Sequence, residues 1–194
     1  MSSLIVGDDG RARCAWAGRD AEYQRYHDEE WGTPLHGDRP LFEKLSLEGF
    51  QAGLSWITIL RRRPTFRAAF RDFDIDAVAA FDEHDIERLM ADPGIIRNRL
   101  KVEATISNAR VTQALVRAHP GALDDLIWGF APPRRERPPA SLSELPAVTA
   151  ESTALSKQLK KLGYRFVGPT TIYALMQSGG LVDDHVAGCW RSSS

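Results

Sequence analysis

The sequence is poor in cysteine and has neither long apolar runs nor an excess of charge of one sign. It has two cysteines and a formal net charge of −1. No segment approaches the roughly 20 apolar residues that a membrane-spanning helix needs, so we expect no membrane partner. Residues 1–10 lack the apolar stretch of a secretory leader. We therefore expect a cytoplasmic protein whose two cysteines do not form a disulfide.

The balanced charge also argues against a protein that coats long stretches of DNA, because such proteins are usually basic. Any contact with DNA must come from local clusters of cations. The sequence has three of these: Arg61 to Arg63, then Arg97, Arg99 and Lys101, then Lys157, Lys160, Lys161 and Arg165. Each cluster is equally explained as the solvated face of a helix.

The length of 194 residues suits one domain with a sizeable core. We expect a single all-α domain over residues 13–190, between an N-terminal tail (1–12) and a C-terminal tail (191–194). A loop over residues 131–146 contains five prolines and is expected to connect two groups of helices.

Helical periodicity and capping residues locate the expected helices. One begins at Asp38-Arg39-Pro40, and Leu41, Leu45, Glu48 and Ala52 share one stripe of it. Ser55 is a candidate cap for the next helix, and Asp82 with Asp85 resembles a capping box. The expected helices cover 38–52 and 56–62, then a stretch with Ile86, Leu89 and Met90 that the break at Asp92-Pro93-Gly94 ends, and then 102–109, 152–162 and 170–177.

Two cysteines and two histidines have the residue types of a structural zinc site. His185 and Cys189 are four positions apart, so on a helix they would share a face. Together with Cys14 and His27 they would form a closed tetrahedral set that joins the two ends of the domain. The spacing is equally compatible with inert thiols and ordinary histidines. Asp184 is a candidate to orient an imidazole, or else a helix cap.

The segment Asp92-Pro93-Gly94-Ile95-Ile96-Arg97, between two expected helices, is typical of a helix–hairpin–helix element. Such a turn presents backbone N–H groups to a phosphate, and Arg97 and Lys101 would add contacts that do not depend on sequence. A plain turn between two helices is the alternative.

Glu48 stands out because a carboxylate on an apolar stripe is unfavourable unless it is paired. A Lys44–Glu48 pair on one helix face is the structural explanation. The functional explanation is an acid in a binding pocket, and aromatic residues lie nearby in sequence: Trp16, Tyr23, Tyr26, Trp31 and Trp56.

Taken together, these segments resemble the DNA-3-methyladenine glycosylase I family, from about Arg13 to Cys189. The most specific motif is Glu48-Gly49-Phe50-Gln51-Ala52-Gly53-Leu54-Ser55-Trp56, combined with the four candidate metal ligands. The other matching segments are 13–16, 26–32, 94–98, 154–157, 166–171 and 180–185.

The resemblance implies the fold of helix–hairpin–helix glycosylases, with one structural Zn²⁺ bound by Cys14, His27, His185 and Cys189. It assigns base recognition and catalysis to Glu48 and Tyr26, stacking to Trp56, and the pocket lining to Trp16 and Tyr23. Gly53 and Leu54 match the segment that enters the duplex, although Leu54 is alternatively a buried turn residue. Two departures from the family pattern are Asp183, where Asn is usual, and a chain that ends soon after Cys189.

The implied activity is excision of 3-methyladenine from alkylated double-stranded DNA by a monomer that flips the base out of the helix. Between Gly94 and Pro120 the only carboxylate is Glu103, and no lysine is marked as a Schiff-base nucleophile. We therefore expect a monofunctional hydrolase that leaves an abasic site. The main alternative is a non-catalytic, zinc-stabilised helix–hairpin–helix DNA-binding module. A zinc hydrolase is disfavoured because protein side chains would fill all four ligand positions.

Overall fold

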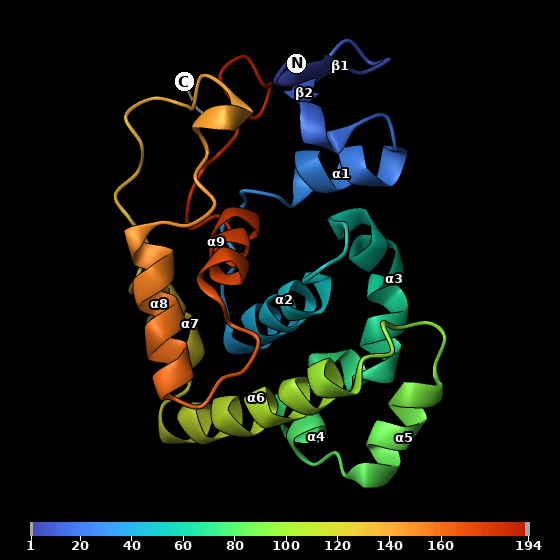
Figure 1. The fold of residues 1–194 in the computed structure, drawn as a ribbon. Coiled ribbons are helices and arrows are strands. Elements are labelled where there is room, and N and C mark those ends of the chain that lie inside the picture. Colours follow the sequence, from blue (N-terminus) through green and yellow to red (C-terminus); the bar gives the residue numbers. More distant parts are fainter. Residues whose placement is uncertain (1, 193–194) are drawn as a thin grey trace.

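The computed structural model describes residues 2–192, which are mostly helical (Figure 1). Two short strands, β1 (Leu4–Val6) and β2 (Ala12–Cys14), pair antiparallel with Leu4 opposite Cys14. The helices are α1 (Ala21–Glu29), α2 (Asp38–Gln51), α3 (Trp56–Ala69), α4 (Ile75–Ala79), α5 (Glu83–Ala91), α6 (Arg99–Ala118), α7 (Ala122–Trp128), α8 (Ala150–Lys161) and α9 (Pro169–Ser178). Single turns occur at η1 (Ala15–Ala17), η2 (Arg71–Phe73) and η3 (Leu142–Glu144).

The N-terminal segment is not the tail that the sequence suggests. Residues 4–6 form β1, and the backbone N–H of Ala15 also donates to the carbonyl of Ser3 at 2.8 Å. Strands of three residues are too short to show an alternating pattern. The prediction of a tail over 1–12 is therefore wrong for the described residues of that segment.

Local capping explains where several helices begin. The capping box of Asp82 and Asp85 is present at the start of α5, as predicted. A second box, Thr149 with Ser152, starts α8 two residues before the predicted position. Asp38 does not cap α2: its carboxylate accepts the backbone N–H groups of residues 121, 123 and 124 at the start of α7. Asp38 therefore ties α2 to α7.

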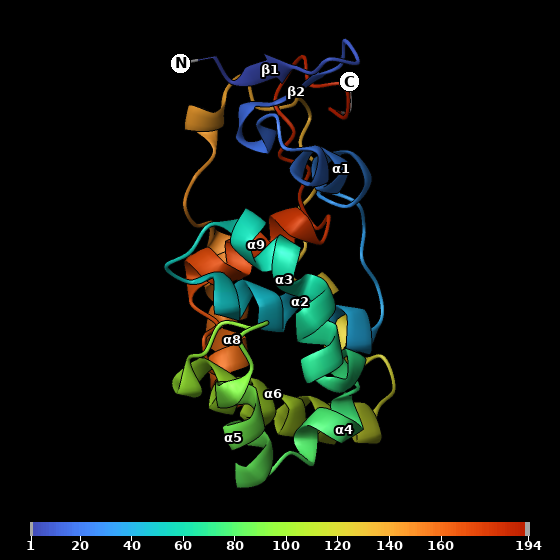
Figure 2. The same ribbon diagram turned by 90° about the vertical axis from the view of Figure 1, so that its right-hand side faces the viewer.

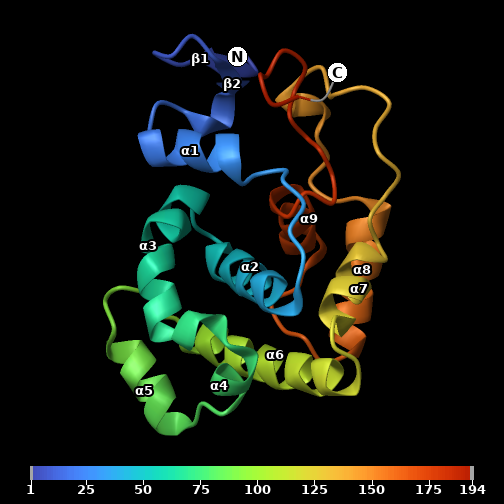
Figure 3. The same ribbon diagram turned by 180° about the vertical axis from the view of Figure 1, so that it is seen from behind.

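Helix α2 lies at the centre of the molecule and packs against α3, α6, α7 and α9 (Figure 3). Leu41, Leu45 and Glu48, which share its predicted stripe, are all buried, whereas Ala52 lies past the helix end and is exposed. One apolar core surrounds this helix. A functional side chain on α2 is therefore held on a helix that four other helices surround.

The two ends of the chain meet at one pole of the molecule (Figures 1 and 2). Cys14, Val186 and Cys189 form a small second cluster of buried residues there. The backbone N–H of Trp190 donates to the carbonyl of Ala12 at 2.8 Å, so the C-terminal segment is fixed against β2. Among residues 2–192 no helix combines the length and the apolar character that crossing a membrane requires.

Candidate active site and metal centre

A pocket of about 190 Å³ opens between α1, α2, α3 and α9. It contains five of the residues that the sequence assigned to base recognition, drawn from four different elements. Its lining residues are Trp16, Tyr23, Tyr26, Trp31, Glu48, Gln51, Trp56, Leu145, Ala174, Gln177 and Ser178. The structure therefore brings Glu48, Tyr26, Trp56, Trp16 and Tyr23 together in one cavity.

The aromatic side chains of this pocket pack against one another edge to face or tilted. The ring centroids of Trp16 and Trp31 are 5.0 Å apart, those of Trp16 and Tyr23 5.1 Å, and those of Tyr26 and Trp56 5.5 Å. Such pairs fix ring orientation beyond simple burial. Contacts within the protein thus hold the rings of the pocket wall in their orientations.

Glu48 is the acidic group of the pocket and is only 3% exposed. Its Oε1 accepts a hydrogen bond from the Ser178 hydroxyl at 2.8 Å. Burial raises the pKa of Glu48 to about 7, and the charge of Lys44 and the Ser178 hydrogen bond limit that rise. Near neutral pH the carboxyl group is therefore poised between its protonated and ionised forms.

Lys44, one turn before Glu48, is buried as well. Its Nζ lies 5.2 Å from the ring centroids of both Tyr26 and Trp56. Burial lowers the pKa of Lys44, and the charges of Glu48 and Glu30 oppose this shift. In the described chain Lys44 and Glu48 form no direct ion pair, so the structural explanation of Glu48 as half of a contact pair does not hold.

Two further groups of the pocket wall are available as donors. Burial, followed by the charge of Glu48, raises the pKa of Tyr26 well above its usual range, so its hydroxyl stays protonated. Within the part of the chain that the structure describes, the buried indole N–H of Trp56 has no hydrogen-bond partner. Buried polar groups are rarely left unpaired, so this donor is available to a bound ligand or water.

The α2–α3 turn carries an exposed apolar side chain next to the pocket. Gly53 has a φ of +85°, a conformation that favours glycine. Leu54 is 41% exposed, which rules out the alternative of a buried turn residue. The turn protrudes at the left edge of the view in Figure 2.

The helix–hairpin–helix element is formed by α5, residues 92–98 and α6. The Asp92 carboxylate accepts from the N–H of Gly94 at 2.7 Å, and the hydroxyl of Thr65 donates to the Gly94 carbonyl at 2.6 Å. Arg97 is exposed on this hairpin, as a phosphate contact requires.

Lys101 requires a correction, because it is only 7% exposed. Its ammonium donates to the backbone carbonyls of Phe50 at 2.9 Å and Ala52 at 2.7 Å, at the end of α2. The last carbonyls of a helix lack intrahelical partners and attract a cation. Lys101 therefore holds the α2–α3 turn, and the expectation that it contacts a phosphate is wrong.

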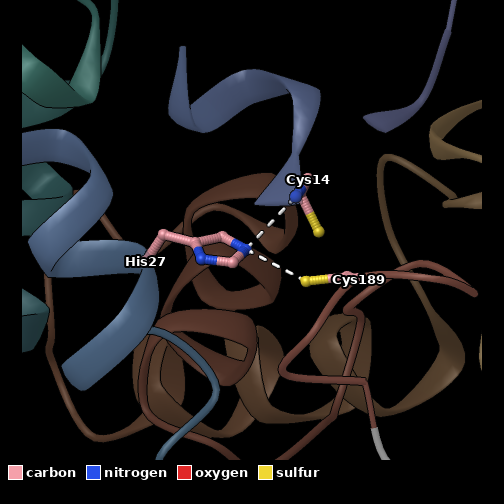
Figure 4. A group of neighbouring side chains, drawn as sticks. All are labelled: Cys14, His27 and Cys189. Carbon is pink, nitrogen blue, oxygen red and sulfur yellow. Dashed lines mark hydrogen bonds between the residues drawn. The ribbon is translucent and has the colours of Figure 1, made fainter. Parts of the chain in front are cut away.

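Three of the four predicted metal ligands converge. The ligand atoms of Cys14, His27 and Cys189 all lie within 4.8 Å of one another, and all three residues are buried (Figure 4). The His27 Nε2 lies 3.4 Å from the Cys189 Sγ. A hydrogen bond from the neighbouring Cys14 thiol lowers the pKa of Cys189, which favours its thiolate form.

His185 lies beside this group and fits the role of a fourth ligand. Its ring centroid is 5.0 Å from that of His27, at an interplanar angle of 87°. Its Nε2 is buried and, among the residues described, has no hydrogen-bond partner. An orphaned ring nitrogen next to two thiols and another imidazole is the chemistry of a Zn²⁺ site.

Carboxylates orient both imidazoles from behind. The Asp28 Oδ1 lies 2.8 Å from His27 Nδ1, and the Asp183 Oδ1 lies 2.9 Å from His185 Nδ1. Such partners fix which ring nitrogen is free to bind a metal. Asp184, the candidate for this role from sequence, instead accepts from the Tyr173 hydroxyl at 2.5 Å. Asp183, noted as a departure from the family pattern, is thus suited to orient His185.

Several pocket residues escaped the sequence analysis. Ser178, which donates to Glu48, lies at the end of α9, 130 positions away along the chain. No local pattern marks it. Gln51 lies within the most specific motif, between Glu48 and Trp56, so that motif was the signal that could have identified it.

Comparison with known proteins agrees with this geometry. Residues 16–192 match the model of a family described as methyladenine glycosylase. The DNA-3-methyladenine glycosylase 1 of Escherichia coli K12 is 49% identical over 179 residues, covering 91% of this chain and 95% of that protein. The Haemophilus influenzae DNA-3-methyladenine glycosylase is 46% identical, covering 91% and 96%.

Solved structures give the same result. A crystal structure of a 3-methyladenine DNA glycosylase I superposes with a TM-score of 0.89 at 46% identity, covering 93% of this chain and all of that one. A variant of a 3-methyladenine DNA glycosylase I, solved in complex with 3-methyladenine, superposes with a TM-score of 0.84 at 34% identity, covering 94% and 98%.

Proposed function

The chain belongs to the methyladenine glycosylase family, and from this membership we propose that it excises 3-methyladenine from alkylated DNA. The observation that carries the proposal is the buried carboxyl of Glu48 in the lining of an aromatic pocket. The relative solved with 3-methyladenine supports the choice of base.

The lesion's own charge explains why this pocket suits it. Methylation at N3 makes the adenine cationic, so the base accepts the electrons of the breaking bond and leaves as a neutral molecule without prior protonation. Water adds its oxygen to the sugar carbon as the bond to the base breaks, and releases a proton. The enzyme therefore needs to favour the cation and the flipped geometry more than it needs a strong acid.

The pocket residues divide this work. The face of Trp56 attracts the cationic ring, with about 0.5–2 kcal/mol when water is excluded. The ionised form of Glu48 adds charge attraction that neutral adenine does not receive. The protonated hydroxyl of Tyr26 donates to the acceptor atoms of the base. Selection thus follows from the charge of the lesion.

The product of this reaction is an abasic site in an uncut strand. Among the described residues that line the pocket none is a lysine, the side chain that would form a Schiff base with the sugar. Glu48 is the group placed to accept the proton of the attacking water when it is ionised. The enzyme therefore acts as a monofunctional hydrolase.

Extrusion of the base requires contacts outside the pocket. Leu54, exposed on the turn after α2, is suited to fill the gap left by a flipped nucleotide in duplex DNA. Arg97 on the hairpin supplies a phosphate contact. Both lie on elements that α2 and α6 hold in place.

The metal centre has a structural role in this proposal. Cys14, His27, His185 and Cys189 would hold one Zn²⁺, which when bound supplies a cross-link between the two ends of the domain. Trp16 and Tyr26 are neighbours of these ligands along the chain and line the pocket. The site thus fixes the pocket wall without taking part in the chemistry.

The test is chromatography of the bases released from methylated duplex DNA, followed by a check for strand breaks. We expect release of 3-methyladenine and an intact strand that breaks only after alkali treatment. A folded protein that binds DNA but releases no base would favour the non-catalytic DNA-binding module.

A further inference from the structure

The connection between α8 and α9 carries an aromatic side chain in a strained and exposed position. Phe166 has a φ of +56°, in the left-handed region that bulky side chains avoid. Nevertheless 39% of its surface is exposed. Glycine adopts this backbone conformation without strain. The backbone geometry therefore does not explain why a phenylalanine occupies position 166.

The rest of this connection is firmly anchored. Tyr164 and Val167, on either side, are buried, and the hydroxyl of Ser156 donates to the Val167 carbonyl at 2.6 Å. The buried amide of Asn108 on α6 bonds both backbone groups of Arg165, accepting at 2.8 Å and donating at 3.0 Å. Strain persists only where the surroundings enforce it, and strained residues concentrate at functional sites.

These clamps leave two adjacent side chains exposed, the cation Arg165 and the aromatic Phe166. Lys157, Lys160 and Lys161 on the neighbouring α8 are exposed as well. The combination of an exposed aromatic with surrounding cations is typical of a surface that binds nucleic acid, where rings contact bases and sugars and cations contact phosphates.

Phe166 also lies next to the catalytic helix. Its Cβ is 3.6 Å from the point that a Cβ on Gly49 would occupy, one residue after Glu48. It lines a small surface crevice together with Gly49 and Lys101, the residue that holds the α2–α3 turn. In Figure 1 the α8–α9 connection runs beside α6, and in Figure 2 the α2–α3 turn and the start of α6 lie toward the same edge.

We propose that Phe166 is a further DNA-contacting residue, which packs against the duplex beside the point where Leu54 enters, while Arg165 contacts a phosphate. The proposal rests on the proposed function, because it assumes that duplex DNA occupies this face. It adds a contact from the C-terminal half of the chain to those of the α2–α3 turn and the hairpin.

The test uses Phe166→Gly, which removes the ring and relieves the backbone strain. We expect its free energy of unfolding to be unchanged or higher, and its binding of free 3-methyladenine, followed by tryptophan fluorescence, to be unchanged. Its affinity for a duplex with a stable abasic-site analogue should fall about tenfold, with an unchanged salt dependence. Phe166→Tyr, which keeps the ring, should bind the duplex like the wild type.

Arg165→Ala is the matched comparison, because loss of a phosphate contact should reduce the slope of log affinity against log salt by about one. Phe166→Asn, a residue that tolerates left-handed backbone, replaces Phe166→Gly if the latter does not fold.

Wild-type duplex affinity in folded Phe166→Gly or Phe166→Asn would overturn the proposal and leave Phe166 as packing over Gly49. Failure of the wild type to release any base would instead refute the proposed function, and the two failures are therefore separable.

Discussion

At the scale of single residues, the burial of Glu48 is unfavourable for stability and supplies the acidic group of the pocket. A carboxyl group that is 3% exposed loses most of its hydration, and only the Ser178 hydroxyl donates to it among the contacts of the described chain. The resulting pKa of about 7 compares with a usual value of 4.5. The folded state therefore binds this proton more tightly than the unfolded state does.

This difference predicts how stability depends on pH. Below about pH 4.5 the carboxyl group is protonated in both the folded and the unfolded state, so its burial does not lower the free energy of unfolding through ionisation. As pH rises toward 7, the unfolded state gains a solvated charge, and the free energy of unfolding falls. Glu48→Gln removes this loss, so we expect the variant to match the wild type at pH 4.5 and to be more stable at pH 8.

At pH 8 the free energy of unfolding of Glu48→Gln should exceed that of the wild type by on the order of 3 kcal/mol, at 1.36 kcal/mol for each pKa unit. The loss of the attraction between Lys44 and the Glu48 carboxylate reduces this gain. Urea unfolding of both proteins at pH 4.5 and pH 8 measures it. Equal stability at both pH values would mean that the Glu48 carboxyl group is better solvated than the structure indicates.

The sequence identifies residues whose burial or spacing conflicts with their chemistry, and it misses those that act only through the tertiary fold. Glu48 is visible because it interrupts an apolar stripe. Ser178 is not, because a serine at the end of a helix is ordinary until α9 places it 2.8 Å from Glu48. In the sequence Lys101 belongs to a cluster of cations, and only the tertiary fold shows that its ammonium bonds the carbonyl of Phe50 at the end of α2.

At the scale of elements, the contact between α6 and α2 links the hairpin to the turn that carries Leu54. Lys101 makes this link through the carbonyls of Phe50 and Ala52. Lys101→Met should therefore lower the free energy of unfolding by about 2 kcal/mol and weaken duplex binding without changing its salt dependence.

Arg97→Met is the matched control, because it removes an exposed cation of the same hairpin. We expect it to leave stability unchanged and to reduce the salt slope of duplex binding by about one. Denaturant unfolding and fluorescence anisotropy at several salt concentrations measure both quantities. A reduced salt slope with unchanged stability in Lys101→Met would restore its original assignment as a phosphate contact.

Periodicity and caps located the long helices, because their signals are local, but they covered only part of two of them. The predicted ranges 56–62 and 102–109 compare with Trp56–Ala69 for α3 and Arg99–Ala118 for α6. The sequence missed α1, α4 and α7, which have nine, five and seven residues. Elements this short gain most of their stability from tertiary packing. The sequence also gives no signal for the turn at residues 71–73. Arg71, Asp72 and Phe73 all have positive φ, and none of them is glycine.

At the scale of the whole molecule, the metal centre connects segments that are far apart in the sequence. His27 on α1 and Cys14 at the end of β2 face Cys189 from the C-terminal segment (Figure 4). The spacing of these residues suggested the site, but spacing alone did not distinguish it from unrelated thiols. Their convergence, and the orphaned Nε2 of His185, support the interpretation as a metal centre.

We expect the purified protein to contain one zinc per chain and to lose stability on chelation. A cross-link that closes a loop of more than 100 residues is worth on the order of 4–5 kcal/mol by the entropy it removes from the unfolded chain. Metal analysis and thermal unfolding before and after chelation measure this.

His185→Ala should contain less zinc and respond less to the chelator. A protein that keeps its stability but loses base release when the metal is removed would contradict a structural role and favour a catalytic one.

The central claim is that the pocket around Glu48 both recognises and excises a cationic methylated base. The most direct measurement is the rate of 3-methyladenine release from methylated duplex DNA by the wild type and by Glu48→Gln, at equal zinc content and folded fraction. The account predicts release by the wild type and a rate at least tenfold lower in the variant. Equal rates for the two proteins would contradict it.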